Sequence, residues 1–520
     1  MEYEYIIIGS GVAGTTVAKQ LLNNNNKTSI LMIEAGPLVE MKKQRSWWDY
    51  VVSGNRPYDF CEDKKISEGE NISSGETSWT FKESRLMIYG GSTVHWGGWS
   101  LRFKPEDFEL YSRTGRGADW PITYDELEPY YCHAEKYLSV GGDSLDDSIP
   151  RSKPFPLEPF PFTNADGMMI KSFKRLGISF SKMPIARYGH CVTTGTCKYC
   201  PYGARFSASF ILDELNSKEQ YPNFTVMQET VAIRLLLDSK EQISGVEYTT
   251  ENSEKIDGVA RGKQYIVCSG AYESPKLLLN SKSHQFWKNG IGNDNDLVGR
   301  FLISHPFLFA RGKLRDNSNR MQQEIDFPTL LSRHYDSPEE QEAGKLVMFK
   351  SRSRPRVALA DEMIKGLSKS AIDELSRGEM EIELQGFMEE FSNYNNRVGI
   401  ASGKNQFGLP QTEVNFTRNS DFEERANQRL SLMKDVINDM GLEVTKSGVR
   451  NQRGDHASST CRMSKCPENG VVDSNLQVHG VKNLHICSNA VFPSGAAVNP
   501  TLTLTALSFR LAEHLINIRA

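Results

Sequence analysis

Two polar residues near the C-terminus have the types and surroundings of a proton-transfer site. His456 lies in a turn rich in glycine, serine and threonine, and Asn499 follows 43 positions later, directly before Pro500. A base that removes a proton from an alcohol needs a pKa near the working pH, which makes histidine the usual choice, and a second polar group must hold the oxygen. A lone histidine is more often a structural group. The pair is therefore a candidate that depends on the elements around it.

The first residues of the chain have the order of a dinucleotide-binding unit. An apolar strand at 5–8 runs into a glycine turn at 9–14, a helix that continues to about Leu22, and a second strand at 29–33. A strand, glycine turn, helix, strand and acidic residue in this order predict a βαβ unit that binds a dinucleotide. The alternative is a glycine turn without a ligand.

Each residue of that motif has a physical role. Gly9 permits the tight turn, Gly11 lets the backbone approach a pyrophosphate at the helix N-terminus, and Gly14 lets helix and strand pack closely. Glu34, 20 residues after Gly14, is placed to accept from ribose hydroxyls. The small residue Ala35 that follows favours FAD over NAD.

A second glycine stretch begins at Gly90-Gly91 and continues through Ser92, Thr93, His95 and Trp96. It contains too many glycines for a regular helix or strand, and it predicts a loop whose backbone approaches a flat or phosphorylated group. The alternative is a tight connection between two elements.

Composition narrows the class of protein. The chain has 520 residues, which is too long for a single hydrophobic core, so two or more domains are expected. Its net charge of −4 gives no indication of binding to nucleic acid or to an anionic membrane. No apolar run is long enough to span a bilayer, and acidic residues precede the first strand where a secretory signal carries positive ones. We expect a cytoplasmic protein with free thiols, although export with a signal-bearing partner stays open. The oligomeric state is undetermined.

Three closely spaced cysteines are candidates for a metal site. Cys191, Cys197 and Cys200 are spaced like part of an iron–sulfur motif, but a cluster needs four thiolates and no fourth is near. We therefore expect no metal and a structural loop.

The remaining chain alternates helices, strands and loops. Thr123 and Glu126 predict a capped helix, the proline-rich stretch 141–165 predicts a loop, and a helix is expected at 207–216. Strand character recurs at 224–235, 245–248, 265–268, 307–314, 345–350, 380–388 and 411–417, and helices are expected at 371–377 and 423–440. Residues 37–84, with Trp47 and Trp48, predict a covering segment. The polar stretch 315–342 predicts either a mobile loop over the site or a solvated insertion.

Taken together, the motifs resemble the glucose–methanol–choline (GMC) flavoprotein oxidoreductases. The landmarks run from the glycine turn through Gly90–Trp96, the segments 270–279 and 298–306 and the turn at 456–463 to the tail. That tail, with Asn489, Pro493, Asn499 and Pro500, is similar to the pyranose oxidase and glycoside 3-oxidase-like branch.

The resemblance implies an α/β fold with a discontinuous, Rossmann-like FAD-binding domain and an inserted α+β substrate domain, an antiparallel sheet backed by helices. The expected division is 1–155, 200–305 and 449–520 for FAD, 156–199 as a linker with the cysteine loop, and 306–448 for substrate. It further implies that FAD meets Val231, Ser269, Asn489, Ala490, Asn499, Pro500 and Thr501, besides the residues of the two glycine stretches.

The resemblance also implies the reaction. A ring or primary hydroxyl of a sugar or glycoside is oxidised by hydride transfer to flavin N5, with His456 as the base and Asn499 holding the oxygen. Oxygen or another acceptor takes the electrons. Two alternatives stay open: a dehydrogenase of a non-sugar alcohol that serves a quinone or a redox protein partner, and a non-redox flavin-bound lyase.

This chain departs from the family pattern in two places. His456 is followed by Ala457-Ser458-Ser459, where the family has a proline and a glycine. His95 stands where pyranose oxidase attaches its flavin covalently, but relatives without the link also carry His-Trp there. The sequence leaves covalent attachment open.

Overall fold

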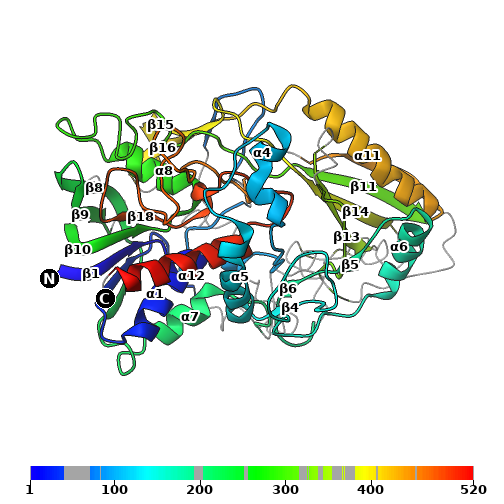
Figure 1. Ribbon diagram of the computed structural model, residues 1–520, viewed down its shortest axis with the longest axis horizontal. Helices are drawn as coiled ribbons and strands as arrows, with labels where there is room; N and C mark the ends of the chain where they lie inside the picture. The colour runs from blue at the N-terminus through cyan, green and yellow to red at the C-terminus, as the bar shows by residue number, and fades with distance from the viewer. Residues whose placement is uncertain are drawn as a thin grey trace.

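A seven-stranded sheet and a six-stranded sheet dominate the computed structural model (Figure 1). The structure describes residues 2–39, 71–81, 84–191, 203–250, 256–314, 325, 327–337, 344–353, 366, 368, 381–405, 408–450 and 454–518. The helix expected at 371–377, the tryptophan pair at 47 and 48, and the cysteines Cys197 and Cys200 lie outside the described residues.

The first sheet contains the predicted βαβ unit. Its strand order is β7-β2-β1-β10-β9-β8, with β18 also paired to β10. The strands are β1 (Glu2–Ile8), β2 (Ile30–Ile33), β7 (Phe224–Met227), β8 (Val231–Ser239), β9 (Gln242–Thr249), β10 (Gly258–Val267) and β18 (Leu484–Ile486). β7, β2, β1, β10 and β18 run parallel, and all four residues of β2 are buried. A parallel strand that is covered on both faces consists of consecutive apolar residues, which explains why β2 is apolar throughout.

Helices from both ends of the chain cover this sheet. They are α1 (Val12–Asn24), α5 (Tyr124–Leu138), α7 (Ala208–Leu215), α8 (Gly270–Asn280) and α12 (Thr501–Asn517). α12 packs against α1 and α5, and Figure 1 shows α8 on the other side of the sheet. Thr123 and Glu126 form the predicted capping box of α5. The C-terminal helix thus lies beside the first one, which brings the last motif of the chain to the first glycine turn.

The second sheet is antiparallel, in the order β17-β11-β14-β13-β12-β5. Its strands are β5 (Ser181–Lys182), β11 (Phe307–Leu314), β12 (Leu330–Tyr335), β13 (Leu346–Ser353), β14 (Glu381–Met388) and β17 (Leu442–Val449). Ile382 and Leu384 of β14 join an apolar cluster with residues of α6 (Asn164–Arg175) and α11 (Phe422–Asp439). Because strand side chains alternate, Glu383 and Gln385 face away from these helices. An antiparallel sheet backed by helices was predicted and is confirmed.

Two ranges differ from their predictions. Residues 156–199, expected to be a linker, include α6 and β5, which belong to the second sheet and its helical layer. The expectation of a mobile or solvated segment at 315–342 is wrong for β12, which pairs with β13 and β5. Leu330 and Leu331 are buried there. Two leucines are enough to anchor a strand, although the average over the whole stretch is polar.

Smaller elements complete the fold. A three-stranded sheet joins β15 (Arg397–Lys404), β16 (Pro410–Asn415) and β3 (Ile72–Ser73), and β4 (Val140–Gly141) pairs with β6 (Ile185–Ala186). The short helices are η1 (Gly91–Val94), η2 (Pro105–Glu109), α4 (Leu110–Thr114) and η4 (Asn489–Val491). Over the described ranges, none of the helices has the length and hydropathy that a bilayer-spanning segment requires.

Candidate active site

The two glycine stretches predicted from the sequence touch each other. Gly9 has a φ of +107°, and a Cβ there would lie 2.6 Å from the backbone oxygen of Cys268. Gly91 has a φ of +58°, and its Cβ would lie 2.8 Å from Cα of Gly11. A side chain at Gly91 would push the two loops apart, and one at Gly9 would collide with the backbone after β10, so both positions require glycine.

Ser10 and Glu34 connect the first turn to the second. The Ser10 hydroxyl donates to Glu34 Oε2 at 2.6 Å and accepts from the Gly90 backbone N–H at 3.0 Å. The other carboxylate oxygen of Glu34 accepts from the N–H of Gly36 at 2.8 Å. Burial raises the pKa of Glu34, although the hydrogen bonds from Ser10 and Gly36 oppose this.

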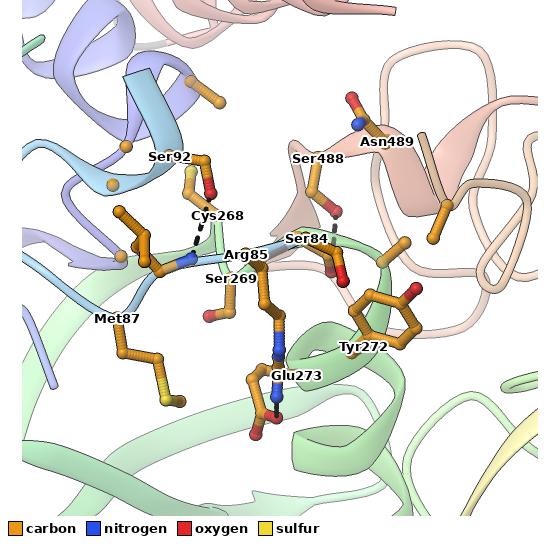
Figure 2. Close-up of a pocket in the computed structure, with 18 of the residues that line it drawn as sticks. Ser84, Arg85, Met87, Ser92, Cys268, Ser269, Tyr272, Glu273, Ser488 and Asn489 are labelled. Carbon is orange, nitrogen blue, oxygen red and sulfur yellow. Dashed lines mark hydrogen bonds and ion pairs between the residues drawn. The ribbon is translucent and has the colours of Figure 1, made fainter. Parts of the chain in front are cut away.

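A cavity of about 620 Å³ runs along these loops, which is within the usual size of cofactor and ligand sites. Figure 2 shows part of its wall, with Ser92, Met87, Ser269 and Asn489 on different sides of the pocket. The predicted cofactor residues that line it are Gly9, Gly11, Glu34, Ala35, Gly91, Ser92, Thr93, His95, Trp96, Val231, Ser269, Asn489, Asn499, Pro500 and Thr501.

Gly14, Gly90 and Ala490 do not line the cavity. A Cβ on Gly14 would lie 2.2 Å from the Gly9 carbonyl oxygen, which matches its predicted role in close packing. Gly90 has its own close contact, since a Cβ there would lie 2.8 Å from the backbone nitrogen of Ser209. Ala490 is fully buried in the core. These three residues support the shape of the cavity from behind.

His456 and Asn499, predicted as a pair, lie in contact on the wall of the same cavity. His456 Nε2 is 3.0 Å from Asn499 Nδ2. On its other side, His456 Nδ1 is 2.9 Å from Nδ1 of His305, whose Nε2 lies 3.0 Å and 3.1 Å from the carbonyl oxygens of Gly495 and Ala496. The structure thus brings together residues from three separate parts of the chain.

This chain of hydrogen bonds determines the tautomers. Carbonyl oxygens only accept, so His305 carries its proton on Nε2 and its Nδ1 is an acceptor. His456 must then donate from Nδ1, and the lone pair on its Nε2 accepts from the Asn499 amide N–H. Burial, with the neighbouring His456, lowers the pKa of His305 to about 3, so it stays neutral. His456 is thereby prepared as a base.

Aromatic rings surround the base. The ring centroids of Phe307 and Phe387 lie 5.5 Å and 5.2 Å from that of His456. Both phenylalanines line the cavity and come from adjacent strands of the second sheet, where they stand directly opposite each other. Their rings keep the space around His456 Nε2 apolar, which strengthens hydrogen bonds made there.

Three residues of the site were not among the predicted site residues: His305, Gln385 and Arg450. His305 stood inside a family landmark at 298–306, but only the fold shows its contact with His456. Gln385, in the middle of β14, and Arg450, directly after β17, line the cavity, and no motif surrounds either of them. No signal in one sequence would have identified either of them.

A buried ion cluster forms another part of the wall (Figure 2). Arg85 and Lys276 lie 3.0 Å and 2.9 Å from Oε1 of Glu273. Burial opposes the charge on Glu273, but Lys276 and Arg85 outweigh it and lower its pKa to about 2. The carboxylate is therefore ionised and holds both cations at the cavity.

Metal binding has no support in the part of the chain that the structure describes. No group of three or more histidine, cysteine or acidic side chains there is arranged to hold an ion. Of the three cysteines in the predicted motif, Cys191 lies within the described residues, and Cys197 and Cys200 lie outside them.

The cavity fits a large cofactor with hydrogen-bond donors. The Oδ1 atoms of Asn489 and Asn499 are buried and accept no hydrogen bond from the described residues. Buried acceptors normally have partners, and both side chains line the cavity. A bound dinucleotide with N–H and O–H groups would satisfy them.

Comparisons with known proteins agree with this geometry. Two family models, both described as GMC oxidoreductase, match residues 3–307 and 392–508. The fructose dehydrogenase large subunit of Gluconobacter japonicus is 25% identical, with 99% of this chain and 98% of that protein covered. Paromamine 6'-oxidase of Streptomyces fradiae is also 25% identical, over 98% of this chain and 91% of its own length.

Solved structures show the same fold. Pyridoxine 4-oxidase from Mesorbium loti superposes with a TM-score of 0.68 at 16% identity, covering 99% of both chains. A formate oxidase variant from Aspergillus oryzae gives a TM-score of 0.69 at 15% identity, covering 99% of this chain and 98% of that one. With both family models on the chain and the fold in common, the protein belongs to the GMC oxidoreductase family and is an FAD-dependent oxidoreductase that acts on CH–OH groups.

Proposed function

We propose that this protein oxidises a ring or primary hydroxyl of a sugar or glycoside to the carbonyl. The observation that carries the chemistry is the lone pair of His456 Nε2, which His305 prepares and which faces Asn499 Nδ2 at 3.0 Å. A hydroxyl that replaces this hydrogen bond donates its proton to His456 Nε2 and accepts from Asn499 Nδ2. One oxygen is thus deprotonated and held at the same time.

The residues that would hold FAD are those of the two glycine loops, with Glu34 and Val231, and those beside Asn489 and Asn499. When bound, FAD supplies the acceptor for the hydride that leaves the carbinol carbon. The protein's own part is orientation, the base and the exclusion of water. Arg85 and Lys276, held by Glu273, add positive charge to the cavity wall and favour a bound group that carries phosphates.

The proton taken by His456 is stabilised by its neighbour. After transfer, both ring nitrogens of His456 carry a proton, and Nδ1–H still donates to the neutral His305 at 2.9 Å. A hydrogen bond from a charged donor is stronger than a neutral one, so His305 helps more after proton transfer than before it. Only an interaction that strengthens along the reaction accelerates it. General-base assistance of this kind contributes ~10²–10⁴-fold.

Two lines of support favour a sugar. The relatives include proteins named fructose dehydrogenase and paromamine 6'-oxidase, whose names describe sugar-related substrates. The His456–Asn499 pair, with Asn489, is similar to the pyranose oxidase and glycoside 3-oxidase-like branch. The position of the oxidised hydroxyl on the ring is left to experiment.

The electron acceptor has two candidates. Similar proteins are named both as oxidases and as a dehydrogenase large subunit. Oxygen is one acceptor, and a quinone or a redox protein partner is the other. Hydrogen peroxide formation compared with turnover of an artificial acceptor separates them.

An anaerobic flavin-reduction screen over sugars, glycosides, cyclitols and simple alcohols tests the proposal. We expect sugars or glycosides to bleach the flavin absorbance, because hydride transfer needs no oxygen. Bleaching by simple alcohols alone would overturn the substrate class. A protein that converts a sugar while its flavin stays oxidised throughout would support the lyase alternative instead.

A further inference from the structure

The sheet face over the cavity changes character along its strands. Phe307 of β11 stands opposite Phe387 of β14, beside the catalytic histidine. Further along the same pair of strands, Arg311 stands opposite Glu383. Gln385 lies between Glu383 and Phe387 on β14, and its side chain is on the same face of the sheet as theirs. The wall therefore passes from aromatic to polar with distance from the base.

Glu383 organises the polar part of this wall. Its Oε1 accepts from Nη2 of Arg450 at 2.7 Å and from the amide of Gln385, and its Oε2 accepts from Nε of Arg311. Burial opposes ionisation of Glu383, but Arg450, Gln385 and Arg311 outweigh it and lower its pKa. An ionised carboxylate thus anchors three side chains at once.

That anchoring sets what two of these side chains offer to a ligand. A carboxylate only accepts, so Gln385 turns its NH₂ group to Glu383, and its carbonyl oxygen remains the acceptor of the amide. Arg450 lies with its guanidinium 5.3 Å from the ring centroid of Phe309, which limits its movement. Gln385 and Arg450 both line the cavity that holds His456 and Asn499, whereas Glu383 and Arg311 stand behind them.

The charges of the described residues on this side of the base balance. Arg311 and Arg450 pair with Glu383, and a second carboxylate, Asp455, lines the same cavity next to His456. A balanced, hydrogen-bonding wall does not attract a carboxylate or an ammonium group strongly. It matches a neutral molecule that carries several hydroxyls.

We infer that Gln385 and Arg450 form a subsite for two neighbouring hydroxyls of a neutral polyhydroxylated ring, remote from the hydroxyl that is oxidised. The inference rests on the proposed function and names the substrate class of that same site. The amide oxygen of Gln385 accepts from one hydroxyl, and the guanidinium of Arg450 donates to the next. Aromatic rings near the base and hydrogen-bonding groups further away together orient the ring, so that one hydroxyl reaches His456.

Gln385→Leu and Arg450→Lys test the subsite. The leucine removes the amide while keeping a similar volume, and the lysine keeps the charge beside Glu383 while losing the planar fork. Glu381→Gln is the matched control, because Glu381 lies on the same strand and face but does not line the cavity. The substrates are the best sugar from the screen and its series of single-deoxy analogues.

We expect the wild type to lose at least ~10-fold in kcat/KM when either of two adjacent hydroxyls is missing, since a polar site rejects an analogue that leaves it unpaired. Gln385→Leu should have a lower kcat/KM on the full sugar and should no longer distinguish it from the analogue that lacks one of those hydroxyls. Arg450→Lys should behave in the same way towards the analogue that lacks the other hydroxyl. Most of the change should appear in KM. The Glu381→Gln control should discriminate against the deoxy analogues as the wild type does.

Two results overturn the inference in distinguishable ways. If sugars reduce the flavin but both variants discriminate against deoxy analogues as the wild type does, the subsite is wrong and the proposed function stands. If no sugar or glycoside reduces the wild-type flavin while simple alcohols do, the proposed function fails, and the subsite fails with it.

Discussion

Exchanging His305 for glutamine or asparagine tests how the base is prepared. The ring of His305 bonds His456 through Nδ1 at 2.9 Å and the carbonyl oxygens of Gly495 and Ala496 through Nε2 at 3.0 Å and 3.1 Å. An asparagine amide reaches about as far as Nδ1 of histidine, and a glutamine amide about as far as Nε2. His305→Asn therefore keeps the acceptor for His456, and His305→Gln keeps the anchor to the carbonyls.

The expected loss follows from one hydrogen bond. In His305→Gln, the Nδ1–H of His456 faces no acceptor, and a buried unpaired donor costs ~1–3 kcal/mol. The imidazole avoids this cost by moving its proton to Nε2, which occupies the lone pair that the reaction needs. Returning to the productive tautomer costs the same energy, so flavin reduction should slow by roughly 5- to 150-fold. His305→Asn should stay within about fivefold of the wild type.

The assay is stopped-flow flavin reduction at saturating substrate without oxygen. Flavin absorbance reports FAD content, and melting temperature reports folding, so a loss of rate is not confused with a loss of protein. A purely structural role for His305 would lower the melting temperature of both variants and leave their rates alike. Equal rates for the asparagine and glutamine variants, or a wild-type rate for His305→Gln, would refute the tautomer argument.

Three further predictions concern the base, its partner and a buried histidine elsewhere. His456→Ala should fold, keep its flavin and lose at least ~10²-fold in flavin reduction, because the general base is gone; a wild-type rate would remove His456 from the mechanism. Asn499→Asp should also slow flavin reduction, since it places a negative charge where negative charge develops, and an undiminished rate in stopped-flow would contradict this. Burial, with the charge of His514, lowers the pKa of His485 from 6.5 to about 3. The unfolded chain then binds more protons in this window, so this part of the stability is complete above pH 6.5 and is lost as the pH falls towards 3, by up to ~1.4 kcal/mol per pH unit. His485→Leu should make the melting temperature less sensitive to acid, and melting curves with the same pH dependence as the wild type would count against it.

Local patterns predicted the elements well. The isoleucines of β1 and β2, the Thr123–Glu126 cap of α5 and the alternating residues of β14 each follow from rules that act over a few residues. β12 was missed because its two leucines are diluted by polar neighbours, and their burial depends on β13 and β5, which lie elsewhere in the chain. α6 was missed because the prolines before it dominate that stretch, although Thr163 and Asp166 form a capping box there.

The sequence by itself determined the family, the cofactor and the candidate pair. Glycine spacing depends partly on local backbone geometry, because Gly9 and Gly91 have positive φ angles that side chains disfavour. A constraint of this kind can be recognised in a single sequence. His456 and Asn499 could be identified as candidates because each lies in a short motif whose residues are neighbours in the sequence.

Only the tertiary structure decided how that pair is prepared and what the rest of the wall offers. The contact of His305 with His456 joins residues 151 positions apart. The bond of Arg450 to Glu383 spans 67 positions and crosses between strands. A hydrogen bond depends on distance and direction in space, not on separation along the chain, so neither contact leaves a pattern in the sequence. The tautomer of His456 and the proposed subsite could therefore be inferred only from the tertiary structure.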